Sequence, residues 1–316
     1  FIPDARKFWI KPSVDFLQDV IKLENIGTVI TTGPPHSLHL IGLELKKRTK
    51  IRWITDFRDP WTSIGYHKKL KLTNASQAKH KKLEHLVLNE ADKIIVTSNT
   101  TRQEFSHITQ KPITVITNGY DTSPGNSVAL DVDFTISHIG SLLTGRNPLN
   151  LWKALSELIQ EYPDIKKCFK LQLAGVISSD VLESIYFYGL QSYTKLLGYI
   201  SHDEALQYQK KSQVLLLIEI DSEETQGIIP GKVFEYMASK RPILGIGPTN
   251  WEVGELIAKS NTGKTFTYPQ LDELKSTLLQ WFQEYKKEQL TLPLAEVDQY
   301  HRRELTAKLS KYLAWE

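Results

Sequence analysis

The sequence has few of the features that mark a secreted, membrane-spanning or low-complexity protein. Its 316 residues contain one cysteine, Cys168, so no disulfide can form within the chain and a reducing compartment such as the cytoplasm is expected. The apolar runs reach only about seven residues, against the ~20 that a membrane-spanning helix needs. No charged-then-apolar signal segment opens the chain. The length predicts about two domains, at roughly 100–200 residues for each.

Motifs for metal or ATP chemistry are also scarce. No spacing of Cys and His resembles a zinc site. The string that begins at Gly227 contains Gly-Lys, but it lacks the Ser or Thr of a phosphate-binding Walker loop. Residues 131–133 spell D-x-D, a pattern of metal-dependent sugar transferases, but they precede an apolar run instead of following one. We interpret them as a solvated loop and expect neither a metal nor a cofactor.

Charge is distributed unevenly. Residues 1–125 contain 19 Lys and Arg against 12 Asp and Glu, and the remainder contains 20 against 24. This asymmetry favours two domains that face different partners. Between residues 67 and 82 there are only basic charges, which indicate a solvated face or, as the alternative, reversible contact with an anionic membrane. No aromatic ladder interleaves them, so nucleic acid is not expected. The basic residues of this segment are Lys68, Lys69, Lys71, Lys79, Lys81 and Lys82.

Short β-rich runs alternate with helix-length amphipathic segments. Apolar runs bounded by Gly, Pro, Asn or Ser are typical of strands buried on both faces of a parallel sheet. The repeated order predicts an α/β fold with two doubly wound, Rossmann-like domains, joined by a weakly patterned linker at 118–133. The predicted strands are 28–32, 51–54, 93–97, 113–117, 134–139, 171–174, 194–197, 214–218 and 242–245. The predicted helices include 13–24, 37–48, 147–161, 203–212 and 272–313, the last broken near Pro293.

The most informative string is GIIPGKVFEYMA, at residues 227–238. Pro230 and Gly231 are predicted to open a helix, because Pro suits the first turn and Gly allows close approach to a ligand. Lys232 in the first turn opposes the helix dipole, which a bound phosphate would explain. Glu235, one turn further, would lie where a ribose could donate two hydroxyl hydrogen bonds. The alternative is an ordinary helix with a surface lysine and a favourable first-turn glutamate.

A second glycine turn follows a strand in ISHIGSLLTGRNPL, at residues 136–149. Gly140 would allow close backbone approach, and Arg146 could clamp a phosphate with two hydrogen bonds. Alone, this spacing is common in strand–helix turns. Both glycine turns, however, fall at the carboxyl ends of strands in one predicted domain, where open α/β sheets bind ligands. We therefore predict one pyrophosphate pocket between them.

Two strings in the first half place polar residues after strands. WITDFRDPWTSI, at residues 53–64, contains Asp56, Arg58 and Asp59. This trio could position a polar substrate and serve acid–base chemistry, or its members could neutralise one another in a structural ion-pair network. TTGPPHSLHLIG, at residues 31–42, places His36 at an apparent helix start, where capping or packing is more common than catalysis.

Taken together, these strings resemble family 4 glycosyltransferases of the GT-B fold, over nearly the whole chain. The resemblance rests on GIIPGKVFEYMASKRPILGIG, ISHIGSLLTGRNPL, LLGYISHDEAL and VITNGYD in the family order. TTGPPHSLHLIG with TDFRDPW is similar to a bacterial branch concerned with surface polysaccharide or lipopolysaccharide assembly. The resemblance implies an acceptor-side domain at 1–125 that lacks its initial strand or strands. It also implies a nucleotide-sugar-binding domain at 126–285, and a carboxyl-terminal helical segment at 286–316 that packs back on the first domain.

By the same resemblance, the chain is an enzyme, a retaining and metal-independent glycosyltransferase. It would move a sugar from a nucleotide-sugar to a lipid-linked or saccharide acceptor in cell-surface polysaccharide synthesis, at the cytoplasmic face of the membrane. Catalysis would involve Arg146 and Lys232 on the diphosphate, with His36, Asp56 and Asp59 facing the transferred sugar or the acceptor. The donor would be bound by Gly140, Ser141, Tyr199, Ile200, Ser201, Pro230, Gly231 and Glu235, with residues 199–201 framing the base.

Two other functions remain open from the sequence. One is a nucleotide-sugar epimerase of related fold. The other is a catalytically degenerate nucleotide-binding scaffold, which two departures from the family pattern favour. Gly227 stands where the family has the first Glu of its E-x(7)-E signature, and Ser141 replaces the Arg that commonly follows the loop glycine.

Overall fold

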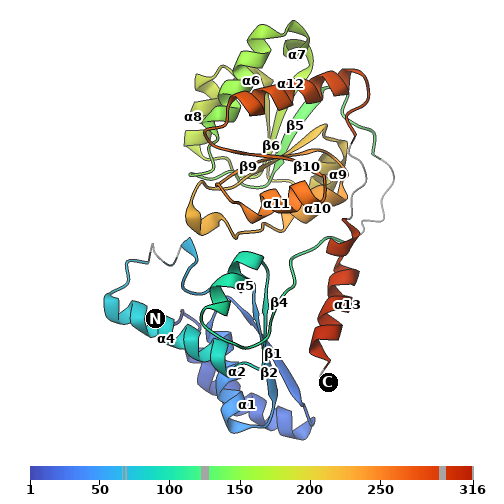
Figure 1. The fold of residues 1–316 in the computed structure, drawn as a ribbon. Coiled ribbons are helices and arrows are strands. Elements are labelled where there is room, and N and C mark those ends of the chain that lie inside the picture. The colour runs from blue at the N-terminus through green and yellow to red at the C-terminus, as the bar shows by residue number, and fades with distance from the viewer. Residues whose placement is uncertain (66, 68–69, 122–127, 292–296, 315–316) are drawn as a thin grey trace. The chain divides into compact units, whose positions relative to one another are not determined.

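The computed structural model describes residues 1–65, 67, 70–121, 128–291 and 297–314, and it divides the chain into two compact units (Figure 1). The first unit comprises Phe1–Thr117, Gly227–Ile229 and Thr306–Glu316, and the second comprises Asn118–Gln226 and Pro230–Leu305. Each contains a parallel sheet with helices against it, which confirms the predicted fold class. The domain bounds and the missing initial strand of the first domain stay predictions.

The first unit is built on a parallel sheet in the order β1-β2-β3-β4. Trp53 and Phe57 of β2 are fully buried and pack with Leu40 and Leu43 of α2. The strands are β1 (Thr28–Gly33), β2 (Arg52–Phe57), β3 (Lys93–Val96) and β4 (Ile113–Val115). The described helices are η1 (Lys7–Trp9), α1 (Ile10–Leu23), α2 (Ser37–Arg48), α4 (Asn74–Glu90), α5 (Asn99–Ser106) and α13 (Arg302–Leu313), of which the last belongs to this unit from Thr306 onward.

The carboxyl-terminal part of α13 is bonded to the sheet of the first unit. The hydroxyl of Tyr312 lies 3.2 Å from the carbonyl oxygen of Ile94 and 2.8 Å from that of Pro112. Lys308 donates from Nζ to the carbonyl oxygen of Val115 at 2.8 Å. These polar contacts satisfy backbone groups next to β3 and β4.

The second unit contains a parallel sheet in the order β10-β9-β8-β5-β6-β7. The chain enters at β5, adds β6 and β7 on one side, and then crosses to β8 on the other side. The strand order therefore reverses between β5 and β8, where doubly wound folds bind ligands at the carboxyl ends of the strands. The strands are β5 (Phe134–Ile139), β6 (Phe169–Ala174), β7 (Thr194–Gly198), β8 (Val214–Ile218), β9 (Ile243–Gly247) and β10 (Gly263–Thr267).

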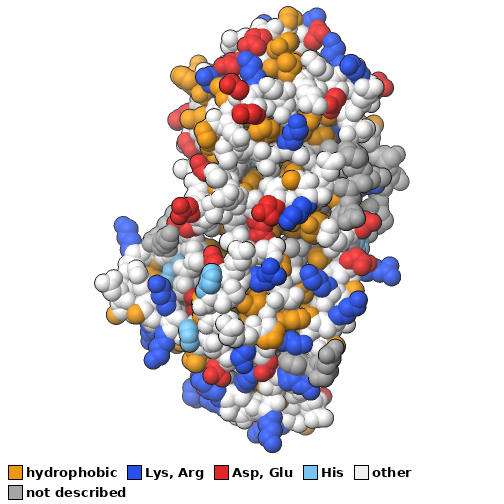
Figure 2. Space-filling model, viewed as in Figure 1, with side chains coloured by type: hydrophobic (Ala, Val, Ile, Leu, Met, Phe, Trp, Pro, Cys, Tyr) orange, Lys and Arg blue, Asp and Glu red, His pale blue; other side chains and the backbone are white. Residues whose placement is uncertain are grey.

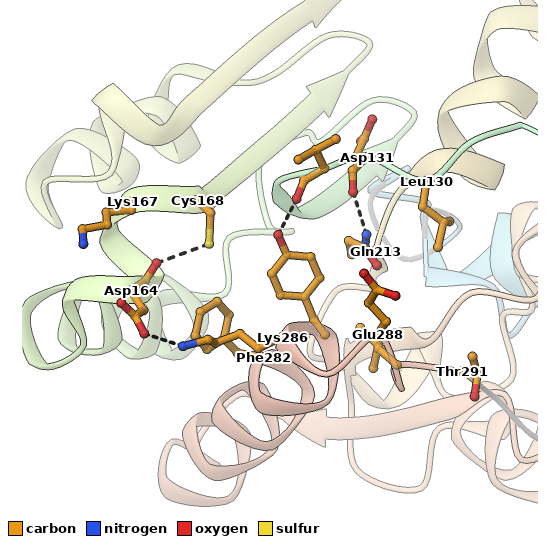
Figure 3. Close-up of a pocket in the computed structure, with 13 residues that line it drawn as sticks. Leu130, Asp131, Asp164, Lys167, Cys168, Gln213, Phe282, Lys286, Glu288 and Thr291 are labelled. Carbon is orange, nitrogen blue, oxygen red and sulfur yellow. Dashed lines mark hydrogen bonds and ion pairs between the residues drawn. The ribbon is translucent and has the colours of Figure 1, made fainter.

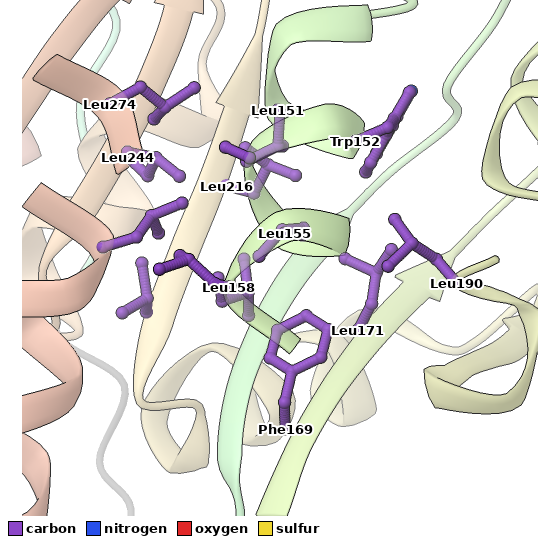
Figure 4. Packing of buried hydrophobic residues seen from close by; sticks show 14 of the residues in the cluster. Leu151, Trp152, Leu155, Leu158, Phe169, Leu171, Leu190, Leu216, Leu244 and Leu274 are labelled. Carbon is purple, nitrogen blue, oxygen red and sulfur yellow. The ribbon is translucent and has the colours of Figure 1, made fainter. Parts of the chain in front are cut away.

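Helices cover both faces of this sheet (Figure 1). Leu151, Leu155 and Leu158 recur at helical spacing on α6 and pack with Leu171 and Leu216 of the sheet (Figure 4). The α helices are α6 (Leu149–Glu161), α7 (Pro163–Cys168), α8 (Ser179–Phe187), α9 (His202–Lys211), α10 (Lys232–Ala238), α11 (Glu252–Lys259) and α12 (Asp272–Lys286). The 3-10 helices are η2 (Gln191–Tyr193), η3 (Glu223–Thr225) and η4 (Asp298–Tyr300).

The observed elements follow the predicted ones, with specific differences. The predictions for 37–48, 134–139 and 214–218 coincide with α2, β5 and β8. β10 was not predicted, because GKTFT alternates half-buried and exposed positions instead of forming an apolar run. The predicted long helix at 272–313 is two helices, α12 and α13, and its break near Pro293 lies outside the described residues. In the described ranges, each helix is either too short or too polar to span a bilayer.

Candidate functional site

Three glycines in the left-handed region lie at the carboxyl edge of the second sheet. Gly140 (φ 127°), Gly175 (φ 93°) and Gly198 (φ 65°) follow or end β5, β6 and β7. The amide of Gly175 donates to the carbonyl oxygen of Gly198 at 2.7 Å. A Cβ on Gly175 would lie 2.8 Å from the carbonyl carbon of Gly140 and from the amide nitrogen of Ser141. The three loops therefore pack backbone against backbone, as a site that approaches a ligand through peptide groups requires.

Lys232 reaches the first of these glycines. Lys232 is the first residue of α10, and its Nζ would lie 2.9 Å from a Cβ placed on Gly140. Burial, reinforced by the nearby Arg146 and opposed by Glu219 and Glu235, lowers the pKa of Lys232 to about 8. Because α10 has only seven residues, the charge at this position comes mainly from the side chain and not from a helix dipole.

Arg146 is held by a carboxylate at the switch point. Its Nε and Nη2 donate to Oε1 of Glu219 at 3.1 and 2.8 Å. Glu219 follows β8 directly and is 2% exposed, and the amide of Ile220 donates to the same oxygen at 2.8 Å. One edge of the guanidinium is thus occupied, and within the described part of the chain no hydrogen bond from Nη1 is found. Glu219 is not among the site residues predicted from the sequence. The feature that could have indicated it is its position, as an acidic residue directly after the apolar run VLLLI.

Glu235 is presented by a firmly anchored helix. The buried hydroxyl of Tyr236 accepts a hydrogen bond from the amide of Ile139, at 3.0 Å, and so ties α10 to β5. Oε2 of Glu235 accepts from Nε2 of Gln209 at 3.0 Å. The carboxylate of Glu235 therefore has a defined orientation on a fixed backbone.

His138 lies near the two cations, at the last position but one of β5. Its Nδ1 lies 3.0 Å from the carbonyl oxygen of Leu216, so this nitrogen carries the proton. Burial lowers the pKa of His138 to about 3, and Lys232 and Arg146 reinforce the effect. The imidazole is therefore neutral near pH 7, and the positive charge of the site comes from Lys232 and Arg146.

The other predicted donor residues lie around these groups with different exposure. Tyr199 is 95% exposed beyond β7, and Ile200 is half-buried. Ser201 caps α9: its amide donates to Oε2 of Glu204 at 2.8 Å, so that amide is already used. Ser141 and Gly231 are exposed, and Pro230 is half-buried.

The backbone conformation at Gly231, at the start of α10, does not require a glycine. Gly231 has φ −53°, which any residue adopts, and a Cβ there would meet nothing within 4 Å. A side chain at this position would therefore point into open space. Gly140, in contrast, combines a positive φ with the close approach of Lys232.

His36 of the first unit is buried, at 6% exposure. Its ring stacks on Trp61 with centroids 4.6 Å apart and an interplanar angle of 5°. Neither ring nitrogen has a partner among the described residues, and burial lowers the pKa of His36 to about 4. His36 does not cap α2, because the amide of Ser37 donates to Oδ2 of Asp4 at 2.9 Å. Its predicted role toward substrate stays a prediction.

Asp56 and Asp59 lie at the carboxyl end of β2, which extends to Phe57 and so includes Asp56. Oδ2 of Asp56 accepts from Oγ1 of Thr32 at 2.8 Å. Burial raises the pKa of both carboxyls, and Arg58 opposes the shift in each. Arg58 donates to the carbonyl oxygen of Pro34, and no ion pair joins it to either carboxylate among the described residues. Asp56, Arg58 and Asp59 therefore do not form the structural ion-pair network that was one of the two interpretations of this string.

A cavity of about 700 Å³ lies at the opposite end of the second sheet, beside the amino ends of its strands (Figure 3). It is lined by residues that precede β5, β6 and β8, including Asp131, Cys168 and Gln213, and by Phe282 of α12. The lining contains none of the predicted donor residues. The cavity and the carboxyl-edge site are therefore separate features of the second unit.

The two parallel α/β units have the fold of GT-B glycosyltransferases. Residues 3–124 match the model of Glycosyltransferase Family 4. The resemblance drawn from the sequence motifs is thus confirmed at the level of family and fold. A comparison with the sequences of curated proteins gives no match.

Solved structures agree on the fold. The Anabaena protein HepE, in complex with UDP, matches over 96% of this chain and 82% of its own, with a TM-score of 0.70 and 14% identity. Sucrose-phosphate synthase from Thermosynechococcus elongatus matches over 99% and 79%, with a TM-score of 0.65 and 12% identity. A putative UDP-N-acetylglucosamine 2-epimerase from Listeria monocytogenes matches over 100% and 82%, with a TM-score of 0.55 and 14% identity.

Proposed function

We propose that the chain transfers a sugar from a nucleotide-sugar to a lipid-linked or saccharide acceptor, and that Lys232 and Arg146 bind the donor's diphosphate beside Gly140. The observation that carries the proposal is the convergence of two cations from separate loops at the switch point of one sheet. The family match of residues 3–124 supports the reaction class, and the UDP complex of the similarly folded HepE supports a nucleotide donor.

In this reaction the bond between the anomeric carbon and the diphosphate oxygen breaks, and its electron pair passes to the diphosphate. Lys232 and Arg146 stabilise the negative charge that develops there, so that the step needs no metal ion. The acceptor hydroxyl forms the new bond on the face that the diphosphate leaves and transfers its proton to the departing diphosphate oxygen, and attack on this face retains the configuration. The resemblance to family 4 supports retention.

The other contacts with the nucleotide-sugar come from residues at the carboxyl ends of the strands and from α10. Glu235 accepts hydrogen bonds from the ribose hydroxyls, and the backbone at Tyr199 and Ile200 frames the base. Asp56 and Asp59 of the first unit accept hydrogen bonds from acceptor hydroxyls, for which two partly buried carboxylates are suited. His36 belongs to the same set on the acceptor side.

The acceptor is encountered at the cytoplasmic face of the membrane, in the synthesis of surface polysaccharide. Exposed Lys71, Lys79, Lys81 and Lys82 support reversible attraction to anionic lipid, with up to about 1 kcal/mol from each. Lys68 and Lys69, predicted to share in this contact, lie outside the described residues. Figure 2 shows many basic side chains over the first unit.

Binding of nucleotides tests the donor site directly. Calorimetry with UDP, ADP and GDP should identify one that binds, and Lys232→Ala and Arg146→Ala should each weaken it by about tenfold or more, as expected for a lost charged hydrogen bond. Lys166→Ala, an exposed lysine on α7, serves as the matched control and should bind as the unchanged protein does. If the unchanged protein binds none of the three nucleotides, the proposal is wrong.

Product analysis distinguishes transfer from epimerisation. The putative epimerase from Listeria monocytogenes has a similar fold, so epimerisation of a nucleotide-sugar is the alternative reaction to test. A transferase consumes the nucleotide-sugar at a rate that depends on added acceptor and releases free nucleoside diphosphate with a new glycosidic bond. An epimerase gives an altered sugar without acceptor, and a scaffold binds the nucleotide without turnover.

A further inference from the structure

Helix α9 carries a buried amide, that of Gln209, whose nitrogen is hydrogen-bonded and whose oxygen is not. Gln209 is 2% exposed, and its Nε2 donates to Oε2 of Glu235 at 3.0 Å. Its Oε1 is buried and has no hydrogen-bond partner among the described residues. The orientation of the amide is fixed by Glu235, because a carboxylate accepts hydrogen bonds and would repel the amide oxygen.

The buried, unpaired oxygen of Gln209 is unfavourable for the fold, so we expect the hydrogen bond to Glu235 to serve a function. A buried acceptor without a donor destabilises the fold, and a methionine of similar length would fill the space without this penalty. Within the described part of the chain, the bond to Glu235 is the hydrogen bond that the Gln209 side chain makes. The benefit of an amide at this position must therefore arise at the carboxylate of Glu235.

The backbone of α10 cannot by itself orient that carboxylate. Val233, Phe234 and Tyr236 are fully buried around it, so the position of the Glu235 main chain is fixed. A glutamate side chain nevertheless has three rotatable bonds, and ordering them has an entropic cost that ligand binding would otherwise bear. A bond from Gln209 restricts these rotations before the ligand arrives.

We infer that Gln209 is a positioning residue for donor binding: it holds Oε2 of Glu235 so that Oε1 is left to accept a hydrogen bond from a ribose hydroxyl. This inference rests on the proposed function, which assigns the ribose to Glu235. It identifies the ligand class more narrowly, as a nucleotide with free ribose hydroxyls, and it adds a residue of α9 to a site built from β5, β8 and α10.

The test compares UDP with 2′,3′-dideoxy-UDP, which lacks both ribose hydroxyls, by calorimetry on the full chain. We expect the unchanged protein to prefer UDP by about tenfold or more, as a charged hydrogen bond implies. Gln209→Met should weaken UDP about fivefold to tenfold and leave the affinity for dideoxy-UDP unchanged. Gln207→Met, at an exposed position of the same helix, is the matched control and should change neither affinity.

The outcomes separate positioning from a merely structural role. If Gln209→Met binds UDP as tightly as the unchanged protein, or weakens both ligands equally, the inference is overturned. Should the methionine variant fail to fold, Gln209→Asn keeps the polar amide but is one methylene shorter, so the bond to Glu235 is lost and the same UDP-selective loss should follow. If the unchanged protein binds neither ligand, the proposed function fails before any variant is made, and the inference fails with it.

Discussion

Raising the pH should weaken binding of the donor diphosphate through one lysine. The pKa of Lys232 in the empty site is about 8, well below the ordinary 10.5, chiefly because the side chain is buried. A diphosphate binds the protonated ammonium and, being an anion, restores its pKa toward the ordinary value. Affinity should therefore be nearly full at pH 7 and should fall as the pH rises through 8 toward the higher pKa of the occupied site.

The magnitude follows from the fraction of protonated Lys232 in the empty site. With a pKa of about 8, roughly nine-tenths of the lysine is protonated at pH 7 and about one-tenth at pH 9. The affinity for a nucleoside diphosphate should therefore fall about tenfold between these values, or ~1.4 kcal/mol. Arg146 keeps its charge throughout the range, because guanidinium groups do not lose their proton in it.

Calorimetry with UDP at both pH values, on the unchanged protein and on Lys232→Arg, measures this effect. The arginine variant keeps a cation that does not titrate, and any ionisation of the nucleotide itself is common to both proteins. The ratio of the two affinities therefore isolates Lys232 and should change about tenfold. A ratio that is constant from pH 7 to pH 9 would refute the assignment of Lys232 to the diphosphate.

Three substitutions should change stability in ways that denaturant unfolding can measure. Lys232→Met should stabilise the empty protein by about 1–3 kcal/mol at pH 7, because it removes a buried charge, and a loss of stability would contradict the burial argument. Gly175→Ala should destabilise by about 1–3 kcal/mol, since its Cβ would contact the backbone at Gly140 and Ser141; an unchanged midpoint would contradict that contact. Leu155→Ala, a fully buried change on α6, should lower the free energy of unfolding by about 2–5 kcal/mol, and a cost below 1 kcal/mol would show that the core collapses around it.

Features with a local signature in the sequence were the predictable ones. Gly140 and Lys232 belong to strings in which a strand, a glycine and a helix follow one another, and the structure brings the two together. Glu219 and Gln209 carry no such signature. Their importance depends on which strands become neighbours where the strand order reverses, and single-sequence periodicity contains no information on strand order.

Polar residues inside strands account for the errors in the first unit. The prediction ended a strand at Ile54, because Thr55 and Asp56 are polar. The strand continues to Phe57 since Trp53 and Phe57, on one face, are both fully buried. The side chain of Asp56 lies where the neighbouring strand offers the hydroxyl of Thr32. The strand is buried on both faces, with the polar Thr55 at 0% exposure, and this burial is a tertiary effect that outweighs local propensity.

The charges of the empty donor site balance at neutral pH, and this balance has a kinetic consequence. Lys232 and Arg146 contribute two positive charges, and Glu219 and Glu235 contribute two negative ones. A diphosphate product adds negative charge beside the buried Glu219, so Glu219 should weaken product binding while it keeps Arg146 oriented. Glu219→Gln retains an oxygen for Arg146 and removes one charge, which is worth about 1–2 kcal/mol at an effective dielectric constant of ~20.

We therefore expect Glu219→Gln to bind UDP roughly tenfold more tightly and to release it more slowly. Calorimetry and stopped-flow release measure the two effects, with Glu223→Gln, an exposed acid of η3, as the matched control. Weaker UDP binding by Glu219→Gln would contradict this prediction, because the variant should lose the repulsion and keep the orientation of Arg146. The two roles can be told apart because orientation requires an acceptor oxygen, which glutamine keeps, whereas repulsion requires the charge, which it lacks.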